Sequence, residues 1–129
     1  MTDKPVSSLM TTPVTTVQAD DTIEQVSERL RSDGLLFAPV VESPNGAPLG
    51  IITAADLLQF QTAKRDSKSV QAWQICSYRP IEVDSDTPLS EVAKLMVERR
   101  IHHVVVMENN VMKGVVSSLD FVKQFIPQE

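Results

Sequence analysis

The stretch Gly50-Ile51-Ile52-Thr53-Ala54-Ala55-Asp56 returns later in the 129-residue chain as Gly114-Val115-Val116-Ser117-Ser118-Leu119-Asp120. Both stretches contain a glycine, two β-branched apolar residues, a small hydroxyl residue and, three positions further on, an aspartate. A chain that repeats itself is built from structural units that pack against one another. The repetition therefore predicts two related units, and any binding site is expected to occur as a related pair.

Upstream of the first stretch, the sequence predicts a strand at residues 14–17 and then a helix of about ten residues. Asp21 is the expected N-cap, with Glu24 three residues later, and Gly34 is well placed to follow the C-cap. One apolar face of the helix is formed by Ile23, Val26 and Leu30.

Two further strands, at residues 35–41 and 49–52, are expected to form a hairpin around the turn-rich residues 43–48. Thr53 then begins a second helix. This helix is expected to carry Leu57, Leu58 and Phe60.

The second copy follows the same order, with strands at residues 81–83, 101–107 and 111–116. Thr87 is the expected cap of its first helix, with Pro88 at the first helical position. The helical stripe is formed by Leu89, Val92, Ala93 and Met96; Glu108, Asn109 and Asn110 form the turn, and Ser117 begins a last helix with Phe121, Val122 and Phe125 on it.

Each copy therefore reads β-α-β-β-α, with short lead-in segments at residues 6–9 and 72–75. Residues 1–62 form repeat 1 and residues 72–129 form repeat 2, separated by a polar linker at 63–71. Neither copy alone would bury its sheet well, so the two are expected to pack together.

Composition narrows the class of protein. Acidic and basic residues are mixed along the chain and give a net charge of −5, which argues against nucleic-acid or anionic-membrane partners. No apolar run approaches the roughly 20 residues that span a bilayer, and the polar start does not resemble a signal peptide. The lone Cys76 is expected to be a buried apolar residue. A cytoplasmic location is expected.

The sequence contains no recognisable catalytic set. Its two histidines are adjacent, no serine lies in a nucleophile-elbow motif, and no Walker-type glycine-rich loop is present. The histidine pair has no cysteine or closely spaced carboxylate to complete a metal site. The chain is therefore not expected to be an enzyme, and no metal and no cofactor is expected.

Taken together, these motifs resemble a tandem pair of CBS domains, also called a Bateman module. The resemblance covers residues 6–125. It rests on Leu9-Met10-Thr11-Thr12-Pro13-Val14, on Asp20-Asp21-Thr22-Ile23, on Phe37-Ala38-Pro39-Val40-Val41 and on the two endings quoted first. It implies an α/β (α+β) fold with two β-α-β-β-α repeats packed sheet to sheet with pseudo-two-fold symmetry, and a disc-like homodimer.

The resemblance also implies a function and a set of ligand contacts. Such pairs are regulatory modules that bind an adenosine-containing nucleotide (AMP, ADP, ATP or S-adenosylmethionine) in the cleft between the repeats. A separate protein target would receive the signal. By this likeness Asp56 and Asp120 would accept hydrogen bonds from ribose hydroxyls, and Thr53 and Ser117 would approach the phosphate. Backbone contacts and walls for the base would come from Thr15, Thr16, Ile81 and Glu82.

Each assignment has a structural alternative. A hydroxyl residue followed three positions later by an aspartate is also a capping box at the start of a helix. One histidine of the pair His102 and His103, or Arg79, could bind a phosphate, but the arginines Arg79, Arg99 and Arg100 could equally form a solvated helix end. Repeat 1 has Leu36 and Phe37 in place of the histidines, so the two sites are not expected to be equivalent. The competing interpretation of the whole chain is a ligand-free dimeric interaction scaffold.

Overall fold

The computed structural model describes residues 3–43 and 46–127, which divide into two compact units. The first-repeat unit comprises residues 15–80, and the second-repeat unit comprises residues 1–14 and 81–129. Both units combine helices with a sheet, which confirms a mixed α+β fold.

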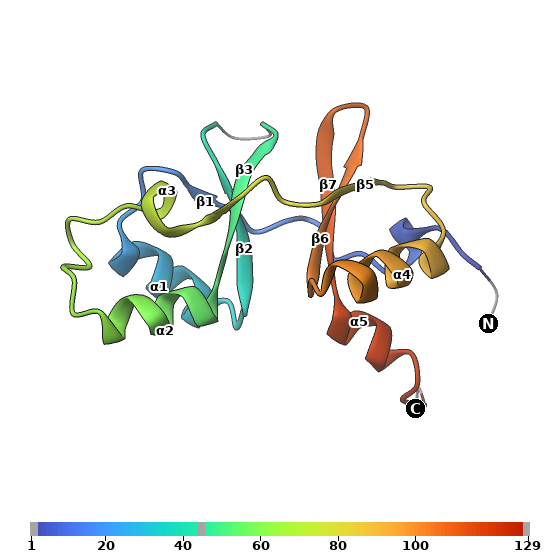
Figure 1. Ribbon diagram of the computed structural model, residues 1–129. Helices are drawn as coiled ribbons and strands as arrows, with labels where there is room; N and C mark the ends of the chain where they lie inside the picture. Colours follow the sequence, from blue (N-terminus) through green and yellow to red (C-terminus); the bar gives the residue numbers. More distant parts are fainter. Residues whose placement is uncertain (1–2, 44–45, 128–129) are drawn as a thin grey trace. The chain divides into compact units, whose positions relative to one another are not determined.

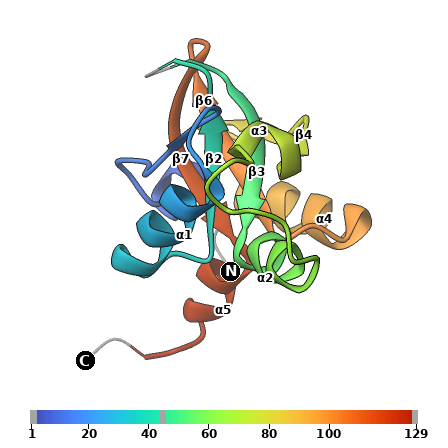
Figure 2. The same ribbon diagram turned by 90° about the vertical axis from the view of Figure 1, so that its left-hand side faces the viewer.

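The first-repeat unit contains a four-stranded sheet in the order β1-β2-β3-β4 (Figure 1). Strand β1 pairs parallel with β2, whereas the β2–β3 and β3–β4 pairs are antiparallel. Its helices lie on one face of the sheet, with α1 beside α2 (Figure 2). The elements are β1 (Val17–Gln18), α1 (Ile23–Ser32), β2 (Phe37–Val41), β3 (Pro48–Thr53), α2 (Ala54–Thr62), α3 (Ala72–Ile75) and β4 (Ser77–Tyr78).

Helix α1 has the predicted length, but its cap differs from the prediction. Thr22, not Asp21, is the N-cap: its hydroxyl accepts a hydrogen bond from the backbone N–H of Gln25 at 3.2 Å, and Gln25 Oε1 accepts one from Thr22 N at 2.8 Å. The Asp21 carboxylate instead accepts from the backbone of Gln18 at 2.8 Å. The prediction for Gly34 is confirmed, because it follows the C-cap with φ +63°, a conformation that glycine adopts without strain.

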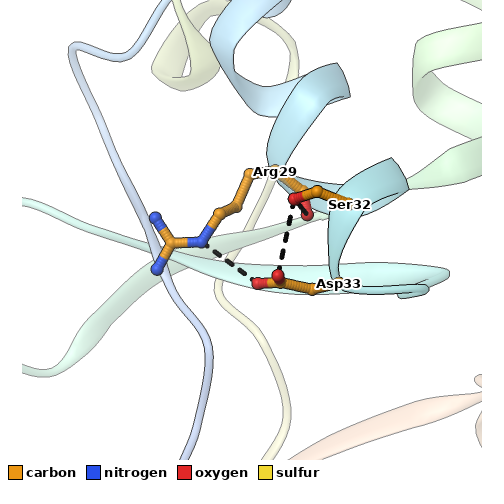
Figure 3. Close-up of polar contacts among 3 residues, drawn as sticks. All are labelled: Arg29, Ser32 and Asp33. Carbon is orange, nitrogen blue, oxygen red and sulfur yellow. Dashed lines mark hydrogen bonds and ion pairs between the residues drawn. The ribbon is translucent and has the colours of Figure 1, made fainter.

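The last turn of α1 carries the ion pair drawn in Figure 3. Arg29 Nε lies 3.3 Å from Asp33 Oδ2, and the hydroxyl of Ser32 lies 3.4 Å from Asp33 Oδ1. Both charged side chains are about half exposed, so solvent screens the pair and it contributes at most about 1 kcal/mol. It supports the end of the helix and does not define a site.

The second-repeat unit has a three-stranded sheet in the order β5-β6-β7, with α4 and α5 on one face (Figure 1). A two-residue turn joins β6 to β7, and both of its residues, Asn109 and Asn110, have positive φ (51° and 65°), as a type I′ hairpin turn requires. The elements are a 3₁₀ turn (Val6–Ser8), β5 (Glu82–Asp84), α4 (Leu89–Arg99), β6 (His103–Glu108), β7 (Val111–Ser117) and α5 (Ser118–Lys123).

Two expectations for the helices of this unit are wrong. Helix α4 begins at Leu89, so Pro88 is the N-cap and not the first helical residue; its side chain has no acceptor for the first N–H groups. Helix α5 ends at Lys123, so Phe125 lies beyond it. The side chain of Phe125 is 78% exposed and therefore outside the core.

The N-terminal segment supplies the cap that α4 lacks. Asp3 Oδ1 accepts a hydrogen bond from Ser90 N at 3.1 Å, and Asp3 Oδ2 accepts one from the Ser90 hydroxyl at 2.6 Å. The carbonyl of Lys4 accepts from Leu89 N at 2.8 Å. An anionic group at a helix N-terminus satisfies orphan N–H donors and interacts favourably with the helix dipole.

Each lead-in segment packs into the unit that carries the other repeat. Val6 is fully buried in the second-repeat core, and Thr11 forms an antiparallel bridge with Val115. In the first-repeat unit Ala72 is fully buried, and β4 extends the sheet alongside β3. Each unit therefore needs residues from the lead-in of the other repeat.

The two glycines of the repeated motif lie where these segments cross the sheet. A Cβ atom on Gly50 would lie 2.4 Å from the backbone oxygen of Ser77 and 2.9 Å from Cys76 Sγ. A Cβ on Gly114 would lie 2.6 Å from Sδ and 3.0 Å from Cβ of Met10. Glycine is needed at both positions because another segment of chain approaches the strand too closely for a side chain.

We predict that Gly50→Ala destabilises the first-repeat unit by about 1–3 kcal/mol, because the backbone of β4 must move away from β3. Gly114→Ala should cost less, because the flexible end of Met10 can move more easily than a backbone carbonyl. Urea unfolding, followed by the fluorescence of Trp73 for the first-repeat unit and by circular dichroism for the whole chain, measures both. If the two variants lost equal amounts of stability, or if Gly50→Ala lost almost none, the close approach of β4 would not be the reason for a glycine at position 50.

Acid titration tests the cap formed by Asp3. Its hydrogen bonds with Ser90 lower the pKa of the Asp3 carboxyl below its ordinary value of 3.8. A lowered folded-state pKa means that the stabilisation is complete above the unfolded pKa and is lost as the pH falls through the folded one. We expect Asp3→Asn to lower the urea midpoint at pH 7, and the difference from wild type to shrink below about pH 4. Asp86→Asn, an exposed carboxylate in the same unit, is the control and should show no such convergence.

Candidate functional site

In each unit most of the candidate residues lie near one corner, where the sheet passes into the last helix of the repeat. In the first-repeat unit the start of β2 and the end of β3 lie at the same end of the sheet, because β3 is antiparallel to β2, whereas the short strand β1 runs parallel to β2 beside the other end of that strand. The register pairs Val17 with Val40 and Phe37 with Thr53. Thr15 and Thr16 immediately precede β1, so they lie on the side of β1 that faces the Phe37–Thr53 end of the sheet.

The second-repeat unit forms the equivalent corner. Glu82 pairs with Val105, and the carbonyl of Ile81 accepts a hydrogen bond from Val105 N at 2.9 Å. His103 pairs with Ser117 across β6 and β7. We call these two places the first corner (Thr15, Thr16, Leu36, Phe37, Thr53, Asp56) and the second corner (Ile81, Glu82, His102, His103, Ser117, Asp120).

The hydroxyl-x-x-aspartate pairs form capping boxes, as the structural alternative predicted. At the first corner Thr53 Oγ1 accepts from Asp56 N at 3.1 Å, and Asp56 Oδ2 accepts from Thr53 N at 2.8 Å. At the second corner Asp120 Oδ2 accepts from Ser117 N at 2.7 Å and from the Ser117 hydroxyl at 3.2 Å. Each box holds its aspartate in one orientation at the start of a helix.

The capping role uses only one oxygen of each carboxylate. Within residues 3–43 and 46–127, no hydrogen bond reaches Oδ1 of Asp56 or Oδ1 of Asp120. Both aspartates are half-buried at the corner. A fixed, partly exposed carboxylate oxygen is a suitable acceptor for hydroxyl groups of a ligand.

The outer residues of the two corners differ although their backbones correspond. The carbonyl of Leu36 accepts from Ala54 N at 2.8 Å, and the carbonyl of His102 accepts from Ser118 N at 2.9 Å. Leu36 is 61% exposed, and His102 is exposed as well. The first corner is thus apolar at its rim, and the second carries an imidazole.

The histidines of the second corner lie close together. Their ring centroids are 6.3 Å apart with an interplanar angle of 74°. His102 is exposed and its Nδ1 lies 3.4 Å from the hydroxyl of Ser118, whereas His103 is half-buried at the start of β6.

Arg79 is not brought to the first corner. Strand β4 is antiparallel to β3 and pairs Ser77 with Ile51 and Tyr78 with Gly50. Arg79 therefore continues toward the start of β3, away from Thr53. The residue is exposed, with φ 57°. Its assignment as a phosphate ligand remains a prediction from the sequence.

Two further features lie outside the corners. A groove between α1 and α2, missed by sequence reasoning, is lined by apolar residues such as Leu30, Leu57 and Leu58, with Arg31 and Arg65 among its charged residues. Cys76 is buried as predicted, and this burial raises the pKa of its thiol, which makes it a poor nucleophile. Among the described residues no group of three or more His, Cys, Asp or Glu side chains could hold a metal, and no described helix is long and apolar enough to cross a membrane.

A model of the CBS domain family matches the chain twice, at residues 6–62 and 72–126. The chain therefore belongs to the CBS domain family and contains a tandem pair of these domains, which confirms the resemblance seen in the sequence. An uncharacterized protein of Methanocaldococcus jannaschii is 26% identical over 136 residues, which cover 95% of this chain and 32% of that protein. A second uncharacterized protein of the same archaeon is 29% identical over 122 residues, covering 94% of this chain and 44% of its own length. The chain thus spans less than half of either relative.

Solved structures share the fold. The CBS domain of a CBS domain containing membrane protein from Sphaerobacter thermophilus superposes with a TM-score of 0.80 at 22% identity, covering 98% of this chain and 90% of that one. The CBS domain of the bacterial CNNM/CorC family Mg²⁺ transporter, solved in complex with ATP, gives a TM-score of 0.85 at 21% identity, covering 98% of this chain and 89% of that one. These likenesses establish the architecture of the chain.

Proposed function

We propose that this chain is a cytoplasmic regulatory module, not an enzyme, that binds an adenosine-containing nucleotide at its corners and signals occupancy to a separate protein. The observation that carries the proposal is the geometry of Asp56 and Asp120. Each carboxylate is fixed by a helix cap through one oxygen and keeps the other oxygen available to a ligand. The proposal is supported by the shared fold with a CBS domain that was solved with ATP.

The chemistry of the corner suits a ribose. A carboxylate accepts hydrogen bonds from the two hydroxyls of a vicinal diol, and a charge-assisted hydrogen bond is stronger than a neutral one. The adjacent hydroxyls of Thr53 and Ser117 can donate hydrogen bonds to a phosphate group of the ligand. The segments before β1 and β5, which contain Thr15, Thr16 and Ile81, offer backbone groups for the base.

The regulatory step requires a difference in affinity. A nucleotide changes the arrangement of the two units only if it binds one arrangement more tightly than another. Because the ligand is a signal and not a reactant, no cofactor chemistry is needed. The ligand is AMP, ADP, ATP or S-adenosylmethionine.

One observation favours a second function, a ligand-free interaction scaffold. The cap at Thr53 is reciprocal, and at Ser117 the backbone N–H and the hydroxyl both donate to Asp120, so these residues have a structural purpose without any ligand. Under this alternative the aspartates stabilise helices only, and the module acts through protein contacts.

Thermal unfolding of nucleotide-stripped protein against AMP, ADP, ATP, S-adenosylmethionine and GTP separates the two functions. A ligand at about one hundred times its Kd adds roughly 2.7 kcal/mol, which raises the Tm by several degrees in a chain of this size. We expect an adenosine ligand to do so and GTP not to.

The variant Asp120→Asn sharpens this test. Asparagine keeps an oxygen that can accept the cap hydrogen bond but loses the charge, so ligand affinity should fall while the ligand-free Tm changes little. Asp86→Asn is the matched control and should bind like wild type. A flat response of wild type across the whole panel, with Asp120→Asn affecting only stability, would establish the scaffold.

We also propose that the module forms a homodimer. Four apolar side chains at and after α5 are more than half exposed: Leu119, Val122, Phe125 and Ile126. Apolar groups gathered in this way mark interaction surfaces. Light scattering at micromolar concentration should give twice the chain mass of 14.3 kDa, and Val122→Lys should shift the protein toward monomer. A wild-type monomer at this concentration would refute the proposal.

A further inference from the structure

Two exposed aromatic side chains of the first-repeat unit have no part in the corners. Trp73 on α3 is 45% exposed, and Tyr78 on β4 is 51% exposed. Large aromatic side chains carry much apolar area and are on average well buried in folded proteins. Their exposure on two neighbouring elements indicates a surface that a partner covers, and such anchors are enriched at the centres of protein interfaces.

Both rings are held in place by their own polar atoms. The indole Nε1–H of Trp73 donates a hydrogen bond to Gln71 Oε1 at 2.7 Å. The hydroxyl of Tyr78 donates one to the backbone carbonyl of Trp73. The polar atoms are thus used within the unit and the rings are ordered before a partner arrives, so little side-chain entropy is lost on binding.

Two acidic residues lie beside these rings, because the backbone of Ala19 joins three segments of the unit. Its N–H donates to the carbonyl of Val41 at 2.8 Å, and its carbonyl accepts from Trp73 N at 3.1 Å. Asp20 and Glu42 are the next residues of the first two segments. Both therefore lie near the start of α3, which is beside β1 in Figure 1.

The carboxylates of Asp20 and Glu42 are exposed, and neither makes a hydrogen bond or ion pair within the described part of the chain. Desolvation and the neighbouring Cys76 thiol raise the pKa of the Tyr78 hydroxyl, and the charge of Glu42 adds to this rise. Arg79 follows Tyr78, but among the described residues no ion pair joins it to either carboxylate. The two rings are therefore bordered by negative charge that the unit does not pair.

We propose, building on the signalling to a separate protein proposed above, that the aromatic surface formed by Asp20, Glu42, Trp73 and Tyr78 binds an arginine-bearing segment of that protein. A guanidinium group stacks on the face of an aromatic ring while its N–H groups donate to a carboxylate. The corners then receive the signal, and the aromatic surface holds the target.

Other occupants fit this chemistry less well. A proline-rich segment could pack on exposed aromatic rings, but it brings no positive charge to Asp20 and Glu42. An acidic segment would be repelled by both carboxylates. Lysine carries a compact, strongly hydrated ammonium group, whereas the planar guanidinium of arginine is more weakly hydrated and stacks on aromatic faces. Charge complementarity and the exposed rings together select arginine.

NMR titration of the full chain with short blocked peptides tests the aromatic surface. The probe has two arginines separated by glycine, and peptides of the same length with lysine or glutamate in place of arginine are the comparisons. Trp73 is the only tryptophan of the chain, so its indole N–H resonance reports binding at this surface directly. We expect a millimolar Kd that is about fivefold lower for the arginine peptide than for the lysine peptide, and no response to the glutamate peptide.

Two variants separate the contributions of ring and charge, with binding followed by the backbone amide of Ala19. Trp73→Leu keeps an apolar side chain without the ring and should raise the Kd of the arginine peptide about fivefold. Glu42→Gln should raise it about threefold. Glu28→Gln removes an exposed charge from α1 of the same unit, so it is the matched control and should bind like wild type. Circular dichroism and the ligand-free Tm establish that each variant is folded.

The outcomes separate this inference from the proposed nucleotide sensing. Equal affinity for the arginine and lysine peptides, or unchanged binding of the arginine peptide by Trp73→Leu, would overturn the inference. If a nucleotide raises the Tm but the arginine peptide does not bind at millimolar concentration, the inference is wrong and nucleotide sensing stands. If the peptide binds as expected and no nucleotide raises the Tm, the aromatic surface stands and the module is a scaffold.

Discussion

Both units depend on one kind of contact: the residues that directly follow each lead-in segment pass close to a glycine of the other repeat. The neighbouring segment leaves no room for a side chain at either glycine. A Cβ on Gly50 would lie 2.4 Å from the Ser77 carbonyl oxygen, and a Cβ on Gly114 would lie 2.6 Å from Met10 Sδ. The crossing carries Val6 and Ala72 into the two cores, where both are fully buried. A small sheet with two helices buries little apolar surface, and the added segment enlarges each core. The repeats are thus linked by packing as well as by the chain.

The order of strands and helices could be predicted from sequence because hydrophobic period and turn residues are local signals. The ten residues of α1 and the turn at Asn109 follow directly from such patterns. Cap positions were less predictable: Thr22 and not Asp21 caps α1, since both residue types suit the role and backbone geometry decides between neighbours. The capping of α4 by Asp3 could not be predicted from the sequence at all. Its partner Ser90 is 87 residues away, and no local pattern connects them.

The correspondence between the two corners could be predicted, because it follows from the repeat in the sequence. The alignment of the two copies matched His103 with Phe37, and the structure pairs these residues with Ser117 and Thr53 respectively. Arg79 could not be placed in this way. Its position depends on the antiparallel pairing of β4 with β3, a consequence of the exchanged lead-in that proximity in sequence does not reveal. The ligand contacts themselves remain predictions for all of these residues.

Helix capping and ligand binding are compatible roles for one aspartate. The cap fixes the carboxylate of Asp56 or Asp120 through Oδ2, so the ordering of that side chain is completed on folding and need not occur on binding. The same kind of cap gives the two corners the same backbone arrangement at the start of the helix. Because the carbonyls of Leu36 and His102 make equivalent hydrogen bonds, their side chains can differ without disturbing the helix start. The fold therefore separates a constant part, which holds the acceptor, from an outer position that is free to set the chemistry of each corner.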